Sequence, residues 1–522
     1  MAKKLLKSGI IFSSMTLISR ILGLVRDIVV ATLLGTSMAA DVFLFANRIP
    51  NFLRRLFAEG AFSKAFVPVL AEYSTDNNIN QTREFIAKIS GTLGVLVSIV
   101  TLIGMIGSPI VAALFGSGWF IDWLNDGPNA EKFSQASFLL KITFPYLWFI
   151  TFVALSGAIL NMLGKFGVMA FTPILLNVAI IAVAIWGSPH FSSPDTALAC
   201  GVFLGGLLQF LFQLPFLKRE GLLVKPKWAW HDEGVAKVRK LMIPALFGVS
   251  VTQLNLLLNQ IIASFLVTGS ISWLYYADRL IEFPLGLFGI AISTVILPSL
   301  SKITKQKDLS EKQRAYTFSQ TMDWGVRMVL LLGIPAMVGI ILLAKPLIAT
   351  MFMRGKFQFD DVIATSNALS IMCFGLVSYM LINVLANGFY AQQDTKTPVK
   401  IGIITAISNI SFGAFAIPFG YLGLSIASAF SAAINACLLY RTLAQRNIYQ
   451  ATLATGLFTL KIAIATSLMG ALIAYFSPSL DSWLLLTLWQ KIHWLLWLIG
   501  LAASCYFSAL FILGIRKSDF RT

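Results

Sequence analysis

The sequence predicts an all-α membrane protein with many spanning helices. Hydrophobic residues make up 57% of the 522 residues and charged residues only 12%, about half the roughly 25% charge of ordinary soluble chains. The mean hydropathy is +0.80. Apolar stretches run continuously over about 20 residues, the length that a helix needs to cross hydrocarbon. A β-barrel would instead show segments of about ten residues with alternating polarity, so the pattern excludes a barrel.

Taken in order, the apolar runs predict fourteen spanning helices. The first seven cover approximately 9–35, 41–57, 85–115, 134–160, 168–186, 197–217 and 241–267. The other seven cover approximately 272–300, 318–343, 362–390, 399–419, 422–440, 453–475 and 483–513. The second run is the weakest, because several polar and basic residues crowd its end. The first run carries Arg20, Arg26 and Asp27 and has no small-residue cleavage site, so we expect it to remain as a spanning helix.

Basic residues identify the cytoplasmic side of this array. The net charge of +17 comes mostly from loops on one side: the segment before the first helix, the stretch 218–240 and the stretch 302–314. Loops 187–196, 268–271 and 420–421 carry no Lys or Arg, whereas Lys345, Arg354 and Lys356 depart from the pattern. Because basic loops stay in the cytoplasm, both termini are expected there. The excess of cations is thereby explained without a nucleic-acid partner.

An internal echo predicts two lobes of the same orientation. Ala46-Asn47-Arg48 recurs as Ala277-Asp278-Arg279, and the strings before and after it recur at nearly the same offset. The copies lie on the second and eighth helices, an offset of six helices, which is typical of parallel repeats related by an axis along the membrane normal. We therefore expect an N-terminal lobe at 1–220, an interfacial cytoplasmic linker at 221–240, a C-terminal lobe at 241–446, and a thirteenth and fourteenth helix with a cytoplasmic tail at 447–522.

Arginines inside or at the ends of apolar runs point to the functional region. Arg20, Arg54 and Arg279 occupy such positions, where a cation persists only if it faces a cavity or a partner. A guanidinium offers paired donors and never deprotonates, which suits the oxygens of a diphosphate. The alternative is that these charges pair within the protein and lock helices together, Arg20 with Asp27 or Arg279 with Glu282.

Signatures of enzymes and cofactors do not occur in the chain. Gly164-Lys165 and Gly355-Lys356 are each followed by Phe, so neither is a phosphate-binding loop for ATP. The three histidines lack the spacing of metal ligands, and the four cysteines all fall in apolar runs, where packing is their expected role. We expect a transporter without a cofactor, driven by the membrane potential, an ion gradient or the substrate gradient, with the coupling ion left open.

Several motifs resemble those of a known family. The strings are SRILGLVRD at 19–27, PNFLRRLFAEGAF at 50–62 and ADRLIEFP at 277–284, supported by LKITFPY at 140–146 and QDTKTP at 393–398. They resemble the MurJ (MviN) lipid II flippases of the multidrug/oligosaccharidyl-lipid/polysaccharide exporter superfamily. The resemblance covers essentially the whole chain, and the second string is its most specific part.

The resemblance implies a two-lobed flippase that moves an undecaprenyl-diphosphate-linked peptidoglycan precursor from the inner to the outer leaflet of the bacterial cytoplasmic membrane by alternating access. Its partners would be lipid II, membrane lipids and the cell-wall synthesis machinery. Residues that match the family's head-group site are Arg20, Arg26, Arg54, Arg279, Asn51 and Ser272. Residues that match its acidic charge partners, which we expect to act in gating, are Asp27, Asp41, Glu59 and Glu282.

The last two helices match a family groove that is thought to take the polyprenyl tail. Small residues Gly470, Ala471 and Ala474 are the candidates to line it, although ordinary helix packing explains them nearly as well. One departure concerns a sodium site that some members build with an acidic residue on helix seven. The run 241–267 offers only the amides Gln253, Asn255, Asn259 and Gln260, which puts sodium coupling in doubt.

Two other functions remain open from the sequence. An ion-coupled small-molecule exporter of the same superfamily predicts a cavity dominated by acidic residues, whereas arginines dominate here. A noncatalytic scaffold for cell-wall assembly predicts that the cavity charges are dispensable.

Overall fold

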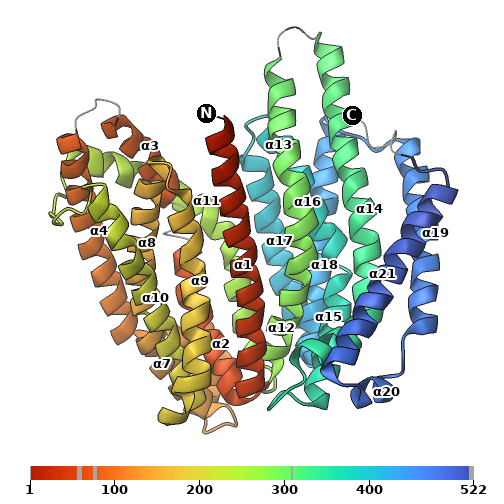
Figure 1. Cartoon of the computed structure of the whole chain (residues 1–522), viewed down its shortest axis with the longest axis horizontal. Helices are drawn as coiled ribbons and strands as arrows, with labels where there is room; N and C mark the ends of the chain where they lie inside the picture. Colours follow the sequence, from red (N-terminus) through yellow and green to blue (C-terminus); the bar gives the residue numbers. More distant parts are fainter. Residues whose placement is uncertain (1, 56–61, 75–78, 307, 309, 517–522) are drawn as a thin grey trace. The chain divides into compact units, whose positions relative to one another are not determined.

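The computed structural model describes residues 2–55, 62–74, 79–306, 308 and 310–516. Within these residues every regular element is a helix, which confirms the all-α prediction (Figure 1). Internal packing divides the chain into two compact units. Unit 1 comprises Met1–Ser272 with Arg354–Phe357, and unit 2 comprises Trp273–Met353 with Gln358–Thr522. The predicted lobe ranges, which rest on the internal echo, stay a prediction.

Unit 1 contains the first eleven α-helices of the chain. They are α1 (Ala2–Leu34), α2 (Met38–Leu53), α3 (Ser63–Ser74), α4 (Ile79–Ile106), α5 (Ser108–Phe115), α6 (Ser117–Leu124), α7 (Ala130–Thr143), α8 (Pro145–Met162), α9 (Phe166–Ala182), α10 (Pro194–Arg219) and α11 (Glu233–Ala263). Short turns η2 (Val183–Gly187) and η3 (Ser188–His190) follow α9. Helix α12 (Ser270–Pro284) begins in unit 1 and continues into unit 2.

Unit 2 contains the remaining helices. They are η4 (Leu285–Gly289), α13 (Ile290–Lys305), α14 (Glu311–Phe352), α15 (Phe359–Cys373), α16 (Leu376–Tyr390), α17 (Lys396–Phe415), η5 (Ile417–Phe419), α18 (Gly420–Gln445), α19 (Leu453–Phe476), α20 (Leu480–Leu485) and α21 (Leu488–Ile512). Helix α14 is much longer than the predicted run 318–343. It starts at a capping box, in which Ser310 and Gln313 satisfy each other's backbone N–H groups.

Among the described residues, 11 helical segments are long and apolar enough to cross a membrane. Helices α1, α2 and α11 lie outside these 11 segments, although they coincide with the predicted first, second and seventh spans. Helix α2 has only 16 residues, which is short for a bilayer of about 30 Å. The structure therefore confirms a multi-spanning helical protein, and the count of fourteen spans stays a prediction.

Prolines divide two predicted runs into two helices each. The run 85–115 is interrupted at Gly107, with Pro109 in the first turn of α5, and the run 134–160 is interrupted at Phe144, before Pro145 of α8. A proline cannot donate to the preceding turn, and it disfavours the helical conformation of the residue before it. Hydropathy alone does not register these breaks. Two short helices, α3 and α6, also fall outside the predicted spans, and α20 overlaps only the start of the run 483–513.

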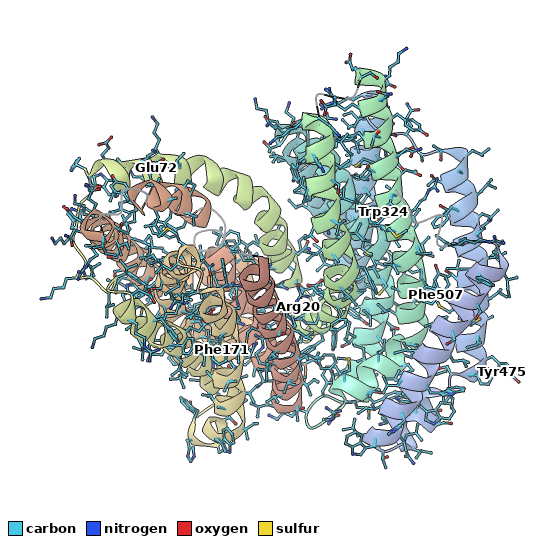
Figure 2. The ribbon with its side chains drawn as sticks, turned by 45° about the horizontal axis from the view of Figure 1, so that its top comes forward. Arg20, Glu72, Phe171, Trp324, Tyr475 and Phe507 are labelled. Atoms are coloured by element: carbon cyan, nitrogen blue, oxygen red, sulfur yellow. The ribbon has the colours of Figure 1, made fainter. Side chains whose placement is uncertain are left out.

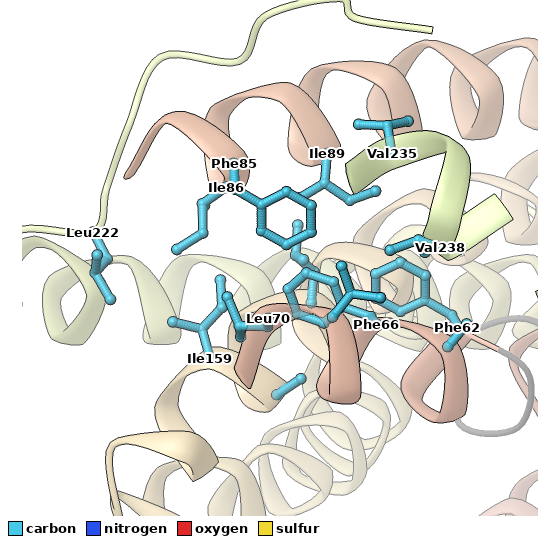
Figure 3. Packing of buried hydrophobic residues seen from close by; sticks show 14 of the residues in the cluster. Phe62, Phe66, Leu70, Phe85, Ile86, Ile89, Ile159, Leu222, Val235 and Val238 are labelled. Carbon is cyan, nitrogen blue, oxygen red and sulfur yellow. The ribbon is translucent and has the colours of Figure 1, made fainter. Parts of the chain in front are cut away.

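A cluster of aromatic and aliphatic side chains explains why α3 and α11 pack in unit 1 (Figure 3). Phe66 of α3 stacks on Phe85 of α4 with ring centroids 6.0 Å apart, and Tyr73 stacks on Phe85 at 4.4 Å. Val235 and Val238 of α11 complete the cluster. The predicted linker leads into it: the backbone N–H of Lys227 donates to the carbonyl of Ala87 on α4 at 2.8 Å.

In unit 2, helices α19 and α21 pack against α14 through a continuous apolar cluster and specific hydrogen bonds. Pro335 lies inside α14, so the carbonyl of Leu331 lacks the N–H that would normally bond to it. The hydroxyl of Tyr506 on α21 donates to this carbonyl at 2.7 Å. At another level of α14, the indole N–H of Trp483 donates to Thr350 at 3.2 Å, and both groups are buried.

We expect replacement of Tyr506 by Phe to lower the stability of the folded protein. The change leaves a buried carbonyl without a donor, which costs about 1–2 kcal/mol within a membrane protein. Thermal unfolding of the purified protein in detergent would measure the loss as a lower midpoint. Tyr475→Phe is the matched control, because Tyr475 is 83% exposed. Equal midpoints for the two variants would contradict the role of the Tyr506 hydroxyl.

Candidate functional site

Helix α1 carries two candidate arginines in different environments. The side chain of Arg20 is exposed on α1, where it is labelled in Figure 2. The side chain of Arg26 is only 13% exposed and forms an ion pair with Asp27 at 2.7 Å. Asp27 thus pairs with its sequence neighbour Arg26 and not with Arg20, as one alternative from the sequence had suggested. Arg26 is held in place, whereas Arg20 presents its guanidinium at the surface of unit 1.

A buried asparagine that the sequence analysis did not single out fixes Arg26. Asn177 of α9 is 6% exposed and accepts a hydrogen bond from Nη1 of Arg26 at 3.1 Å. Its amide nitrogen donates to the carbonyl of Ser19 at 3.1 Å, so both ends of the amide group bind α1. The close packing of α1 on α9 brings this residue to the arginine from 151 positions away. A polar residue inside the apolar run 168–186 was the signal in the sequence that could have identified Asn177.

The end of α2 places Asn51 and Arg54 on one face, because residues three apart are neighbours on a helix surface. Asn51 donates to the carbonyl of Asn47 at 2.8 Å, and its side-chain oxygen accepts from Nε of Arg54 at 3.3 Å. Arg54 caps the helix and is partly exposed. Glu59, a predicted gating residue, lies outside the described residues. The amide of Asn51 therefore orients Arg54 within the same helix end.

Asp41 of α2 is almost completely buried and binds the beginning of α12. Its carboxylate accepts from the backbone N–H groups of Gly269 at 2.7 Å and Ser272 at 3.0 Å, and from the Ser272 hydroxyl at 2.7 Å. The first N–H groups of a helix have no hydrogen-bond partner within the helix, so the carboxylate satisfies them. A negative charge at this end of a helix also interacts favourably with the helix dipole. Ser272 is fully buried and bonded to Asp41, which favours a positioning role over a free head-group contact.

Lys132 of α7 completes this buried cluster and was also missed by the sequence analysis. Its ammonium lies 3.6 Å from the carboxylate of Asp41, and the two side chains are 2% and 1% exposed. The ammonium also lies 5.5 Å from the ring centre of Trp119. A buried cation of this kind needs an opposite charge. The pair joins α2, α7 and the first turn of α12.

In unit 2, Arg279 and Glu282 form the ion pair that the spacing suggested, at 2.8 Å. The guanidinium also donates to the hydroxyl of Tyr275 from Nε at 3.2 Å and from Nη2 at 3.0 Å. Both charged side chains remain partly exposed, 33% for Arg279 and 45% for Glu282. Such a pair is weak enough to exchange partners with an anion.

The three small residues of the predicted tail groove lie in different surroundings. Gly470 is buried and faces α14, where an added Cβ would lie 3.4 Å from Val338 and from Leu342. Ala471 and Ala474 of α19 are exposed. Gly470 therefore supports helix packing, and only the two alanines face outward.

Comparisons with known proteins identify the family. The family model described as lipid II flippase MurJ matches residues 30–493. A probable lipid II flippase MurJ of Haemophilus influenzae is 63% identical over 97% of this chain and 100% of its own length. A lipid II flippase MurJ of Burkholderia cenocepacia is 38% identical over 98% of this chain and 97% of its own. The chain belongs to the MurJ family.

Solved structures agree with this family membership. A structure of lipid II flippase MurJ in an inward closed conformation has a TM-score of 0.79 and 27% sequence identity, covering 97% of this chain and 98% of that one. An inward-facing multidrug resistance MATE family transporter of the MOP superfamily has a TM-score of 0.63 at 14% identity, covering 84% of this chain and 98% of its own. The second similarity shows a shared fold.

The described residues of this MurJ family member also show which groups are available to bind an ion. No group of three or more His, Cys, Asp or Glu is placed there to hold a metal ion. On α11, Gln260 is buried and its side-chain oxygen accepts from Nη1 of Arg48 at 2.8 Å. Gln253 and Asn255 lie among the side chains that are not described. The candidate site is thus built from arginines, amides and single carboxylates.

We expect Lys132→Met to destabilise the protein strongly, because the carboxylate of Asp41 would stay buried without its cation. Loss of one partner of a buried pair costs about 3–5 kcal/mol. The double variant Asp41→Asn with Lys132→Met should recover much of that loss, because it leaves no buried charge. Thermal unfolding and the yield of folded monomer would measure both effects.

The control for this experiment is Lys237→Met. Lys237 pairs with Glu72, but the two side chains are 49% and 56% exposed, so their pair contributes about 1 kcal/mol or less. A loss for Lys132→Met no larger than that of the control would show that the Asp41–Lys132 pair does not stabilise unit 1.

Proposed function

We propose that this chain is a lipid II flippase of the bacterial cytoplasmic membrane. It carries the undecaprenyl-diphosphate-linked peptidoglycan precursor from the inner to the outer leaflet by alternating access, and it is a transporter without catalytic residues. The observation that carries the proposal is the full-length relationship to proteins named lipid II flippase MurJ, at up to 63% identity among those compared.

The physical chemistry of the substrate agrees with the candidate residues. A polyprenyl tail can stay in the lipid during transport, whereas a charged diphosphate and its sugars need a polar route across hydrocarbon. Arginine matches the oxygens of a diphosphate with paired donors and keeps its charge. We assign the diphosphate and head group to Arg20, Arg54 and Arg279. Asn51 and Arg26 support that region, because Asn51 orients Arg54 and because Asp27 and Asn177 hold Arg26.

Asp41 is the candidate for one latch of the alternating-access cycle. Its carboxylate holds the first turn of α12, the helix that carries Arg279 further along. Breaking these three hydrogen bonds would free the beginning of α12. A change of a few kcal/mol at such a point shifts conformational populations by orders of magnitude. Glu59 and Glu282 remain the other proposed gating residues, with Asp27 as the partner of Arg26.

The proposed architecture has fourteen spans in two six-helix lobes, followed by the pair α19 and α21, with both termini in the cytoplasm. Support comes from the echo of Ala46-Asn47-Arg48 at Ala277-Asp278-Arg279 and from the basic loops. The helix pair is the proposed tail site, with Ala471 and Ala474 on its exposed side. No cofactor is expected, the energy source is the membrane potential or an ion gradient, and the cell-wall synthesis machinery is a further expected partner.

Replacing Arg20, Arg54 or Arg279 by Ala should abolish growth of a flippase-depleted strain and leave lipid II on the inner leaflet. Each guanidinium contributes charge-assisted hydrogen bonds of about 1.5–3 kcal/mol, so binding should weaken about tenfold or more. Lys should rescue partly, because it keeps the charge without the paired donors. Leaflet-specific labelling of lipid II would be the measurement.

Arg83→Ala is the control, since Arg83 is exposed in the first turns of α4. Normal growth of all three site variants would favour the scaffold function. Unchanged lipid II distribution on depletion of the protein, with altered resistance to drugs, would favour the small-molecule exporter.

A topology experiment tests the orientation. A reporter that is active only in the periplasm should be active when inserted at Gly127, between α6 and α7, and silent at Gly221, after α10. The stretch 116–131 around the first position carries no Lys or Arg, whereas Lys218, Arg219 and Lys225 surround the second, and basic loops stay in the cytoplasm. Activity at Gly221 and silence at Gly127 would invert the proposed topology.

A further inference from the structure

A cavity of about 350 Å³ opens at one end of α8, α9 and α10 in unit 1. Its walls come from the end of α8, the turn that leads into α9, and the last turn of α10. Its lining includes Phe216 and the charged residues Lys165, Arg219 and Glu220. None of these residues belongs to the proposed transport site, so the cavity is a separate feature of the molecule.

The charged part of the lining has an excess of positive charge. Lys165 forms an ion pair with Glu220 at 2.8 Å, with side chains 49% and 30% exposed. The guanidinium of Arg219 lies over the ring of Phe216, 5.9 Å from its centre, and has no carboxylate within ion-pair distance in the described part of the chain. Two cations therefore face one acid, and the single ion pair is exposed enough to exchange its carboxylate for another anion.

The rest of the lining is apolar and continues along the membrane-spanning helices. Phe216 contacts Phe212, which in turn contacts Phe171, with ring centroids 5.3 Å and 5.1 Å apart; Phe171 is labelled in Figure 2. Along the same helix α10, Leu208 and Leu211 are 39% and 46% exposed. These side chains lie in the candidate span Pro194–Arg219, so they are suited to contact lipid.

The position of the cavity along these spans is that of a lipid head group. The candidate span Phe166–His190 begins at the cavity and the span Pro194–Arg219 ends there, so it lies where both helices leave the apolar layer. Cations at that level attract anionic lipids, at about 1 kcal/mol for each Lys or Arg. A free phosphate would use the cations but not the apolar walls.

We propose that this cavity binds the phosphate-bearing head group of an anionic phospholipid. Lys165 and Arg219 contact the phosphate oxygens, the phosphate takes the place of Glu220 beside Lys165, and the acyl chains lie along the exposed leucines of α10. The bound lipid is a constituent of the membrane and is distinct from the transported substrate.

The test measures binding of a fluorescent phosphatidylglycerol to the purified full chain in detergent. Lys165→Gln combined with Arg219→Gln should weaken binding about thirtyfold, as two contacts of about 1 kcal/mol each imply. The matched control is Lys218→Gln combined with Lys225→Gln, which removes two exposed cations close in sequence to Arg219 that do not line the cavity. Its affinity should change less than twofold.

Glu220→Gln supplies an independent arm, because a gain of binding cannot result from misfolding. Loss of the competing carboxylate should raise the affinity severalfold. Competition with inorganic phosphate and with phosphatidylcholine distinguishes the sources of the phosphate. Neither should displace phosphatidylglycerol at comparable concentration.

Equal losses for the two double variants, or unchanged affinity for Glu220→Gln, would overturn the proposal by reducing binding to general surface charge. Full displacement by inorganic phosphate would assign the cavity to a free anion and would also overturn it. Lipid II transport by the cavity variants is a separate readout, so failure of this proposal leaves the flippase function untouched.

Discussion

Hydrocarbon offers no hydrogen-bond partner, and this constraint governs how the helices of the chain pack. Prolines make it visible, because each one removes a donor from the turn before it. In α9, Pro173 leaves the carbonyl of Met169 without its usual donor, and the hydroxyl of Thr172 donates to it at 2.8 Å. In α14, Pro335 has the same effect on Leu331, and the donor comes from another helix as Tyr506. The carbonyl freed by Pro173 is satisfied within its own helix. The carbonyl freed by Pro335 instead binds the last helix, α21.

The same constraint separates cations that hold the structure from cations that are available to a ligand. Lys132 is buried beside Asp41, and Arg26, whose side chain is only 13% exposed, is held by Asp27 and Asn177. Such groups have fixed partners and are costly to move. Arg20 is exposed on α1, and Arg279 is one-third exposed in a pair on the surface of α12. Exposure and the freedom to exchange partners therefore identify the cations available to a ligand better than charge alone.

The sequence predicted the fold class well, because apolar composition and run length depend only on local chemistry. Of the two pairs that it suggested within one helix, Arg279 with Glu282 follows from helical spacing and forms, whereas Asp27 pairs with Arg26 and not with Arg20. It missed Lys132 and Asn177, because their partners lie in other helices and no local pattern encodes them. The proline breaks were visible as residues, but hydropathy does not weigh a missing N–H group.

The environment of Gly470 shows the same limit and also bears on the lipid tail. Spacing places Gly470, Ala471 and Ala474 close together along α19, with Ala474 about one turn beyond Gly470, but spacing does not show which of them a neighbouring helix covers. Only the structure shows that α14 lies against Gly470. Small size at that position serves the approach of two helices, and it cannot at the same time line a groove.

The attachment of α19 and α21 to α14 then limits how the pair can take part in transport. Thr455 at the start of α19 donates to Asp323 of α14 at 2.6 Å, and Tyr506 and Trp483 add two further buried hydrogen bonds at other levels of the same helix. Separating the pair from α14 would break all three and expose the apolar cluster between them. We therefore expect the pair to stay attached to α14 during any conformational change. A polyprenyl tail that uses this region has to lie on its outer surface, where Ala471 and Ala474 are exposed, because the seam between the pair and α14 is already filled by protein.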